Sequence, residues 1–218
     1  MFKKLKQLFN NKVLICDLDG TLIETKSGRT FPVDIYDWKF KKGIREAVQK
    51  YNPKYLFIVT NQGGIEKGYV KELELIYKLT IIRERIRFTW GIPNVDFAYC
   101  ESTDPNNPFR KPNIGMIEYF RHDYANGNDF DKRNALMIGD ASGLSGQFSD
   151  IDLQTARNAG IRYADVNDFI EAMVPCSVCM DNNCPCDAGD DIPAMLPCDE
   201  NRKRRLKRIL KLRNNYQK

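Results

Sequence analysis

Residues 13–21 read VLICDLDGT, an apolar run that ends at two closely spaced aspartates and a glycine. A short continuous apolar run is typical of a strand buried on both faces of a parallel sheet. Asp17 and Asp19 follow this run directly, and Gly20 allows the chain to turn sharply. Because the active crevice of an open parallel sheet lies beyond the carboxyl ends of its strands, this stretch predicts two reactive carboxylates at such an edge.

The rest of the chain alternates between short apolar runs and helical patterns. Strands are expected at residues 55–59, 95–100, 135–138 and 161–164, with helices near 43–50, 69–89, 114–124 and 153–158. In the segment 69–89 the apolar residues at helical spacing are Leu73, Ile76, Leu79, Ile82 and Ile86. This alternation predicts an α/β fold with a mostly parallel sheet and helices on both of its faces.

Polar residues stand at the ends of three of the predicted strands. Thr60 and Asp140 end or follow two of them, as Asp17 follows the first. Turn formation would explain any one of these residues. Three such residues at three strand ends instead favour a single site at the carboxyl edge of the sheet.

The composition limits the classes of function. Among 218 residues, 42% are hydrophobic and 29% are charged, which is ordinary for one folded domain with an appendage. The single histidine, His122, excludes sites that need several imidazoles, so carboxylates are the expected chemical actors. Seven cysteines, no signal peptide and no long apolar run lead us to expect a soluble protein of an intracellular, reducing compartment, away from membranes.

Charge and cysteine divide the chain into an expected catalytic domain at 1–173 and two appendages. Residues 174–200 hold six acids, no Lys or Arg and five cysteines, and could form a zinc site or a disordered acidic loop. Residues 201–218 hold nine Lys or Arg and no acid, which suits contact with DNA, a nuclear-import signal or a membrane-surface helix. The candidate zinc ligands are Cys176, Cys179, Cys184, Cys186 and Cys198.

The closely spaced carboxylates suit phosphoryl transfer. One carboxylate can attack phosphorus and form an aspartyl-phosphate, while the other gives a proton to the leaving alkoxide. The transferring group carries negative charge on its equatorial oxygens, so a cation, a lysine and hydroxyl or amide donors must face it.

Short motifs in the chain resemble those of the haloacid dehalogenase phosphatase superfamily. These motifs are DLDGT at 17–21, Thr60, Lys111 and GD at 139–140, followed by a later acid. The resemblance implies that Asp17 is the nucleophile, that Asp19 is the general acid and then the base, and that Thr60 and Lys111 bind the phosphate.

The same resemblance implies a Mg²⁺ ion. Asp17, the backbone carbonyl of Asp19 and Asp140 would hold it, a set of oxygen ligands that suits this hard cation. The second acid of the last motif departs from the compact spacing of the family. We expect Asp152 in that role, because it opens the predicted helix after the motif.

Longer segments resemble the 3′-phosphatase domain of polynucleotide kinase/phosphatase. They are LDGTLIETKSGRTFP at 18–32, DW at 37–38, TNQGGIEKG at 60–68 and RKPNIGM at 110–116, within a similarity over about residues 13–170. The resemblance implies Mg²⁺-dependent hydrolysis of 3′-phosphate ends on DNA, which restores 3′-hydroxyls for DNA repair or replication. No GxxxxGK[ST] phosphate loop is present, so a phosphatase without a kinase half is expected.

Several residues beside the motifs could contact the substrate. Trp38 and Phe31 could stack on an unpaired base, but packing of the loop after the first strand is the favoured role for both. The segments between motifs are too short for a lid domain, so an open crevice is expected. Candidates for binding the phosphates near a strand end, or for a merely solvated surface, are Lys26, Arg29, Asn61, Lys67 and Arg110.

Two other functions stay open at this point. A sugar-bisphosphate or histidinol-phosphate type phosphatase shares the four motifs, but characteristically carries a metal-binding Cys/His loop before its RKP, where only Cys100 stands here. An inactive phosphatase fold that serves as a nucleic-acid-binding adaptor is the other alternative. The intact acids and Lys111 count against the adaptor.

Overall fold

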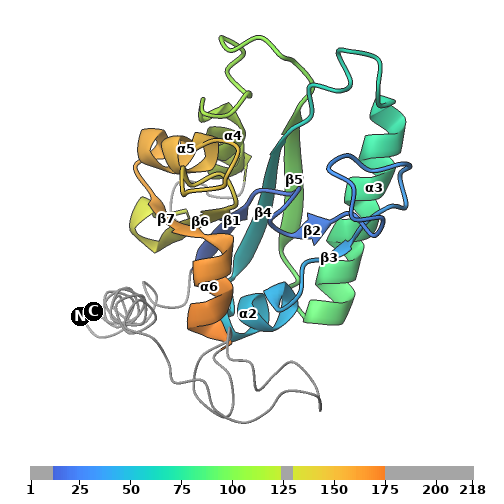
Figure 1. Ribbon diagram of the computed structural model, residues 1–218. Coiled ribbons are helices and arrows are strands. Elements are labelled where there is room, and N and C mark those ends of the chain that lie inside the picture. The colour runs from blue at the N-terminus through green and yellow to red at the C-terminus, as the bar shows by residue number, and fades with distance from the viewer. Residues whose placement is uncertain (1–11, 124–129, 175–218) are drawn as a thin grey trace, which may run out of the picture.

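The computed structural model describes residues 12–123 and 130–174 (Figure 1). The predicted zinc ligands and the basic tail lie outside the described residues. In the described part of the chain no helix is long and apolar enough to cross a membrane.

Five parallel strands form the central sheet, in the order β5-β4-β1-β6-β7. The strand β1 lies in the middle, so residues that follow it enter the centre of the carboxyl edge. This arrangement confirms the predicted parallel sheet. The strands are β1 (Val13–Cys16), β4 (Tyr55–Asn61), β5 (Val95–Cys100), β6 (Ala135–Gly139) and β7 (Arg162–Asp165).

Helices cover both faces of this sheet (Figure 1). Successive side chains of a strand point to opposite faces, so Leu14 of β1 joins one apolar cluster and Ile15 joins the other. The first cluster includes residues of α2 (Ile44–Tyr51), α3 (Glu72–Arg85) and α6 (Val166–Met173). The second includes residues of α4 (Gly115–Asp123) and α5 (Ile151–Ala159). A π-helical turn at Ile86–Trp90 extends α3, and a 3-10 turn occupies Lys132–Asn134.

A small antiparallel ribbon, absent from the sequence-based expectation, follows β1. It consists of β2 (Ile23–Glu24) and β3 (Lys39–Phe40), joined by the loop at residues 25–38. The Asp37 carboxylate holds this loop, because it accepts hydrogen bonds from the Ser27 amide and hydroxyl and from the Val33 amide. The DW pair at 37–38 thus has a physical reason, with Asp37 closing the loop and Trp38 packing beneath it.

The two aromatic residues of this loop region differ in their environment. Trp38 is 6% exposed and meets the Phe40 ring edge-on, with 5.5 Å between centroids, which confirms its packing role. Phe31, for which packing was also expected, is 80% exposed, so that prediction is wrong. The loop is held by hydrogen bonds to Asp37 at its base, and this leaves the Phe31 ring in solvent.

The helix expected over 69–89 also differs in which of its faces is buried. The helix α3 begins at Glu72, and Leu73, which the periodicity placed on the buried face, is 80% exposed. The buried residues of α3 are Leu75, Lys78, Leu79 and Ile82. Leu73 stands two residues before Leu75, so at 3.6 residues per turn it lies on the side of the helix that points away from the core.

Candidate active site

The carboxyl edge of the sheet brings the predicted residues together. Asp17 follows β1, Thr60 lies near the end of β4, and Asp140 follows β6, and these three strands are neighbours. Carboxylate oxygens of Asp17, Asp140 and Asp152 lie within 4.8 Å of one another. The convergence expected from the strand ends is therefore present, and Asp152 belongs to the same cluster.

Lys111 joins two of these carboxylates. Its ammonium nitrogen lies 2.5 Å from Asp17 Oδ1 and 2.7 Å from Asp152 Oδ1, and its side chain is 3% exposed. Asn61 fixes the backbone of this lysine, because its side-chain oxygen accepts from the Lys111 amide and its nitrogen donates to the Lys111 carbonyl. Asn61, expected to bind phosphate, therefore has contacts that instead position Lys111.

Two glycines allow the carboxylates to approach this closely. A Cβ on Gly20, which has φ +80°, would overlap the carboxylate of Asp140. A Cβ on Gly139 would overlap that of Asp152 in the first turn of α5. Space therefore requires both glycines, and the backbone conformation also requires the glycine at position 20.

The carboxylates of the cluster carry more negative charge than the Lys111 ammonium offsets. Burial raises the pKa of Asp17 to about 8, although the charge of Lys111 opposes this rise. Burial and the charge of Asp152 also raise the pKa of Asp140. Burial alone would lower the pKa of Lys111, but the carboxylates of Asp17 and Asp152 raise it. Three carboxylates thus face one ammonium, and this oxygen donor set fits a hard divalent cation.

Asp19 lies on the other side of the site, in a wetter environment. Its side chain is 56% exposed. The side-chain nitrogen of Gln62 donates to Asp19 Oδ2 at 2.9 Å and to the Thr60 hydroxyl at 2.8 Å. The Lys78 ammonium lies 3.5 Å from Asp19 Oδ1. Sequence reasoning missed both Gln62 and Lys78, and the one available signal was a lysine on the apolar stripe of α3.

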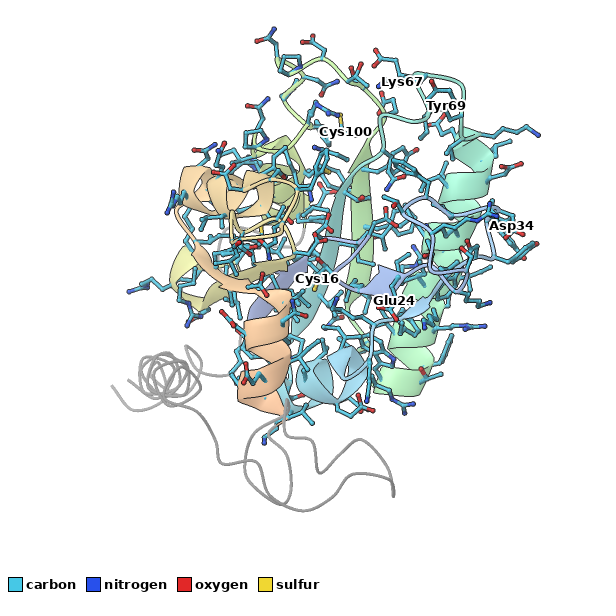
Figure 2. The ribbon with its side chains drawn as sticks, viewed as in Figure 1. Cys16, Glu24, Asp34, Lys67, Tyr69 and Cys100 are labelled. Carbon is cyan, nitrogen blue, oxygen red and sulfur yellow. The ribbon has the colours of Figure 1, made fainter. Side chains whose placement is uncertain are left out.

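Apart from Lys111, the cations predicted to bind phosphate do not contact the carboxylate cluster in the described residues. Lys26 and Arg29 are exposed on the loop at 25–38, and neither pairs with the carboxylate cluster in the described part of the chain. Arg110 is half-buried and donates to the Ser102 carbonyl. Figure 2 shows Lys67 and Tyr69 on the loop that joins β4 to α3, where the Tyr69 side chain is 81% exposed.

Comparison with known proteins places this site in a family. A model described as polynucleotide kinase 3 phosphatase matches residues 12–170. The bifunctional polynucleotide phosphatase/kinase of Schizosaccharomyces pombe is 32% identical over 77% of this chain, which spans only 39% of that protein. The D-glycero-alpha-D-manno-heptose-1,7-bisphosphate 7-phosphatase of Burkholderia mallei is 30% identical over 69% of this chain and 77% of that protein.

A solved structure shares the fold. The D,D-heptose 1.7-bisphosphate phosphatase from B. bronchiseptica, complexed with magnesium and phosphate, aligns with a TM-score of 0.54 at 22% identity. The alignment covers 70% of this chain and 78% of that chain. The haloacid dehalogenase-like fold expected from the sequence is therefore confirmed.

Proposed function

Because the chain belongs to the polynucleotide kinase 3 phosphatase family and has a haloacid dehalogenase-like phosphatase fold, we propose that it removes 3′-phosphates from the ends of DNA in a Mg²⁺-dependent reaction. The observation that carries the choice of substrate is the match of this family model over residues 12–170. The matched region includes the loop at 25–38, which Asp37 and Trp38 hold in place.

The exposed loop that follows the DLDGT motif in the chain supports a polymeric substrate. Phe31 and Tyr36 are 80% and 58% exposed on the loop at 25–38, and Arg29 and Lys26 are exposed on the same loop. Exposed aromatic rings can stack on unpaired bases, and the cations can meet the phosphates between them. A small sugar phosphate has no use for such groups outside the catalytic centre.

The cluster at β1 and β6 supplies the nucleophile. Lys111 contacts Asp17 Oδ1, which leaves Oδ2 to attack the terminal phosphorus. A bond forms between this oxygen and phosphorus while the bond from phosphorus to the 3′-oxygen breaks, which gives an aspartyl-phosphate. Lys111 and the Thr60 hydroxyl then face the oxygens of the transferred group.

Asp19 handles the proton in both halves of the reaction. It gives a proton to the departing 3′-oxygen, so that a neutral hydroxyl leaves. The resulting carboxylate takes a proton from the water that attacks the aspartyl-phosphate, and this restores Asp17 and releases phosphate. The half-exposed position of Asp19 suits this role, because both protons pass through the open side of the site.

The acids fit a Mg²⁺ ion. Asp17, Asp140 and the backbone carbonyl of Asp19 would hold it, while Asp152 holds Lys111 and adds to the negative charge of the cluster. Bound Mg²⁺ would offset the charge of the phosphoryl group and of the carboxylates around it.

A sugar-bisphosphate phosphatase is the second candidate, and the relative from Burkholderia mallei favours it. That class resembles this chain at the motifs but characteristically has a Cys/His metal loop before RKP. Here the segment at 101–110 contains neither residue type, and Cys100 is fully buried with its thiol directed to the Ser102 carbonyl.

The test compares four substrates with the purified full chain in Mg²⁺. They are a 3′-phosphorylated DNA oligonucleotide, the same sequence phosphorylated at its 5′ end, a nucleoside 3′-monophosphate and heptose 1,7-bisphosphate. We expect kcat/KM to be largest by at least about tenfold for the 3′-phosphorylated oligonucleotide, because contacts remote from the phosphorus add binding, and we expect a chelator to abolish the activity. A preference for the heptose bisphosphate would establish the second candidate instead.

A further inference from the structure

Lys78 is a buried lysine on the side of α3 that faces the core. Its side chain is 10% exposed, and its helix neighbours Leu75, Leu79 and Ile82 belong to the apolar cluster. A lysine on such a helix usually extends its ammonium into water, because burying the charge is unfavourable. Burial of this ammonium is therefore unusual. Because it lowers the stability of the fold, we look for a function that the ammonium serves.

The Lys78 ammonium reaches toward the carboxylate of Asp19. It lies 3.5 Å from Oδ1, while Gln62 donates to Oδ2 at 2.9 Å. Each oxygen of the Asp19 carboxylate thus has one donor, Lys78 from α3 and Gln62 from the residue directly after β4. Because the terminal torsion of an aspartate is otherwise broad, two donors from separate elements restrict its rotation.

Free acceptor sites remain on this carboxylate. A carboxylate offers about four lone-pair sites, and the two contacts occupy only part of them. Since 56% of the Asp19 side chain is exposed, the remaining sites are accessible to solvent. In the proposed mechanism, a proton carried there passes to the departing oxygen of the substrate.

We propose that Lys78 is a positioning residue that, together with Gln62, fixes the orientation of Asp19 for proton transfer to the leaving group. This inference rests on the phosphatase activity and on the role proposed for Asp19, and it does not depend on the polynucleotide substrate. The proton moves from the Asp19 carboxyl to the departing oxygen as the phosphorus–oxygen bond breaks. Lys78 keeps its own protons throughout.

If Lys78 orients Asp19, the effect of removing Lys78 depends on whether the leaving group needs a proton. In the first half of the reaction, which kcat/KM reports, the orientation of Asp19 matters only when the leaving group needs a proton. An alkoxide needs one, whereas a thiolate leaves without it, because a thiol has a pKa of about 8.5. A substrate in which sulfur replaces the bridging 3′-oxygen keeps every other contact and removes this single requirement. The ratio of the two rates therefore isolates the proton transfer.

The experiment measures kcat/KM for both substrates with wild type, Lys78→Met and the control Lys71→Met. Methionine has a similar length and suits an apolar environment, while Lys71 is an exposed lysine at the start of the same helix. For Lys78→Met we expect kcat/KM for the oxygen substrate to fall by about 10- to 100-fold. This is part of the roughly 10²- to 10⁴-fold rate enhancement that general acid catalysis gives. With the sulfur substrate we expect kcat/KM of Lys78→Met to fall by less than about threefold. For Lys71→Met we expect no change in kcat/KM with either substrate.

Thermal melting separates positioning from folding. The Lys78→Met variant should melt at or above the temperature of the wild type, because it removes a buried charge. Equal losses with both substrates, with or without a lower melting temperature, would overturn the proposal and assign Lys78 to structure. Unchanged activity with the oxygen substrate would overturn it as well. Failure of the wild type to hydrolyse any phosphomonoester would instead overturn the proposed function, and with it this inference.

Discussion

The two sides of the active site hold their carboxylates in different ways. On the side of β1 and β6, Asp17 and Asp152 are buried and Lys111 contacts them at 2.5 and 2.7 Å. On the side of β4 and α3, Asp19 is half-exposed and its contacts with Gln62 and Lys78 measure 2.9 and 3.5 Å. In the proposed mechanism, the first arrangement keeps charged groups in place for bond formation, whereas the second lets a proton enter and leave.

The largest expected effect is that of Asp17→Asn on the buried side. The amide keeps the shape of the residue but cannot form the bond to phosphorus, so turnover should fall by at least roughly 10⁴-fold. Initial rates on a 3′-phosphorylated oligonucleotide measure this loss, and circular dichroism checks that the variant is folded. Substantial residual turnover at unchanged metal content would remove the nucleophile from the buried side.

Lys111→Met tests whether the buried carboxylates need the Lys111 ammonium for the stability of the fold. Removing a partner from a buried ion pair leaves charge uncompensated, and we expect a loss of about 3 kcal/mol in the free energy of unfolding. The value lies at the low end of the usual range because Asp17, with a pKa of about 8, already takes up a proton readily. Urea denaturation in a chelator measures this change. A variant as stable as the wild type would show that the three acids tolerate each other without Lys111.

Phe31→Ala tests whether the exposed loop at 25–38 contacts the substrate. Loss of one stacking contact should raise KM for a single-stranded 3′-phosphorylated oligonucleotide by roughly tenfold, with kcat little changed. The values for a nucleoside 3′-monophosphate should not change. Phe88→Ala is the matched control, because Phe88 is 79% exposed in the turn beyond the far end of α3. Equal effects of the two substitutions would mean that the loop at 25–38 does not contact bases.

The smallest expected effect concerns the stability of that loop. The hydrogen bond from the Ser27 side chain and that from the Val33 amide lower the pKa of Asp37 to about 2. The folded pKa lies below the unfolded value of about 3.9, so the ionised group stabilises the fold above pH 4 and this contribution is lost as the pH falls toward 2. Asp37→Asn should therefore melt a few degrees below the wild type at pH 7, and the difference should shrink by pH 3. A difference that does not depend on pH would contradict the assigned hydrogen bonds.

The sequence predicts the sheet better than it predicts the contacts around it. The strands β1 and β6 and the first part of β4 are continuous apolar runs, so burial on both faces makes them visible in the sequence, whereas β5 and β7 include charged residues and are only partly buried. The strands β2 and β3 have two residues each, too short for any periodicity, and α6 was also missed. The two short strands depend on packing that appears only after the chain is folded, whereas α6 has a signal in the sequence, since Asp165 caps its first turn and Val166 and Phe169 are at helical spacing.

The site shows the same limit. Asp17, Asp19, Thr60, Lys111 and Asp140 were identified from short motifs beside strands. Asp152 contacts Lys111 across 41 residues, and its place was inferred only from the helix that it opens. Lys78 was not among the residues of the predicted apolar pattern, because a lysine in an amphipathic helix is ordinarily assigned to its solvent-facing side. Phe31 was assigned to packing because an aromatic side chain in a loop gives no sign of the direction in which it points.

The division of work between the two sides is the central claim, and one variant tests it most directly. In Asp19→Asn the buried side keeps its residues, but the carboxylate that we propose activates water is missing. A substrate whose bridging 3′-oxygen is sulfur needs no proton to leave, so phosphoryl transfer to Asp17 should proceed and then stop. Mass spectrometry of the variant after incubation with this substrate should find a phosphoryl group on Asp17. Phosphate released with no such adduct, or an adduct on another residue, would contradict the account.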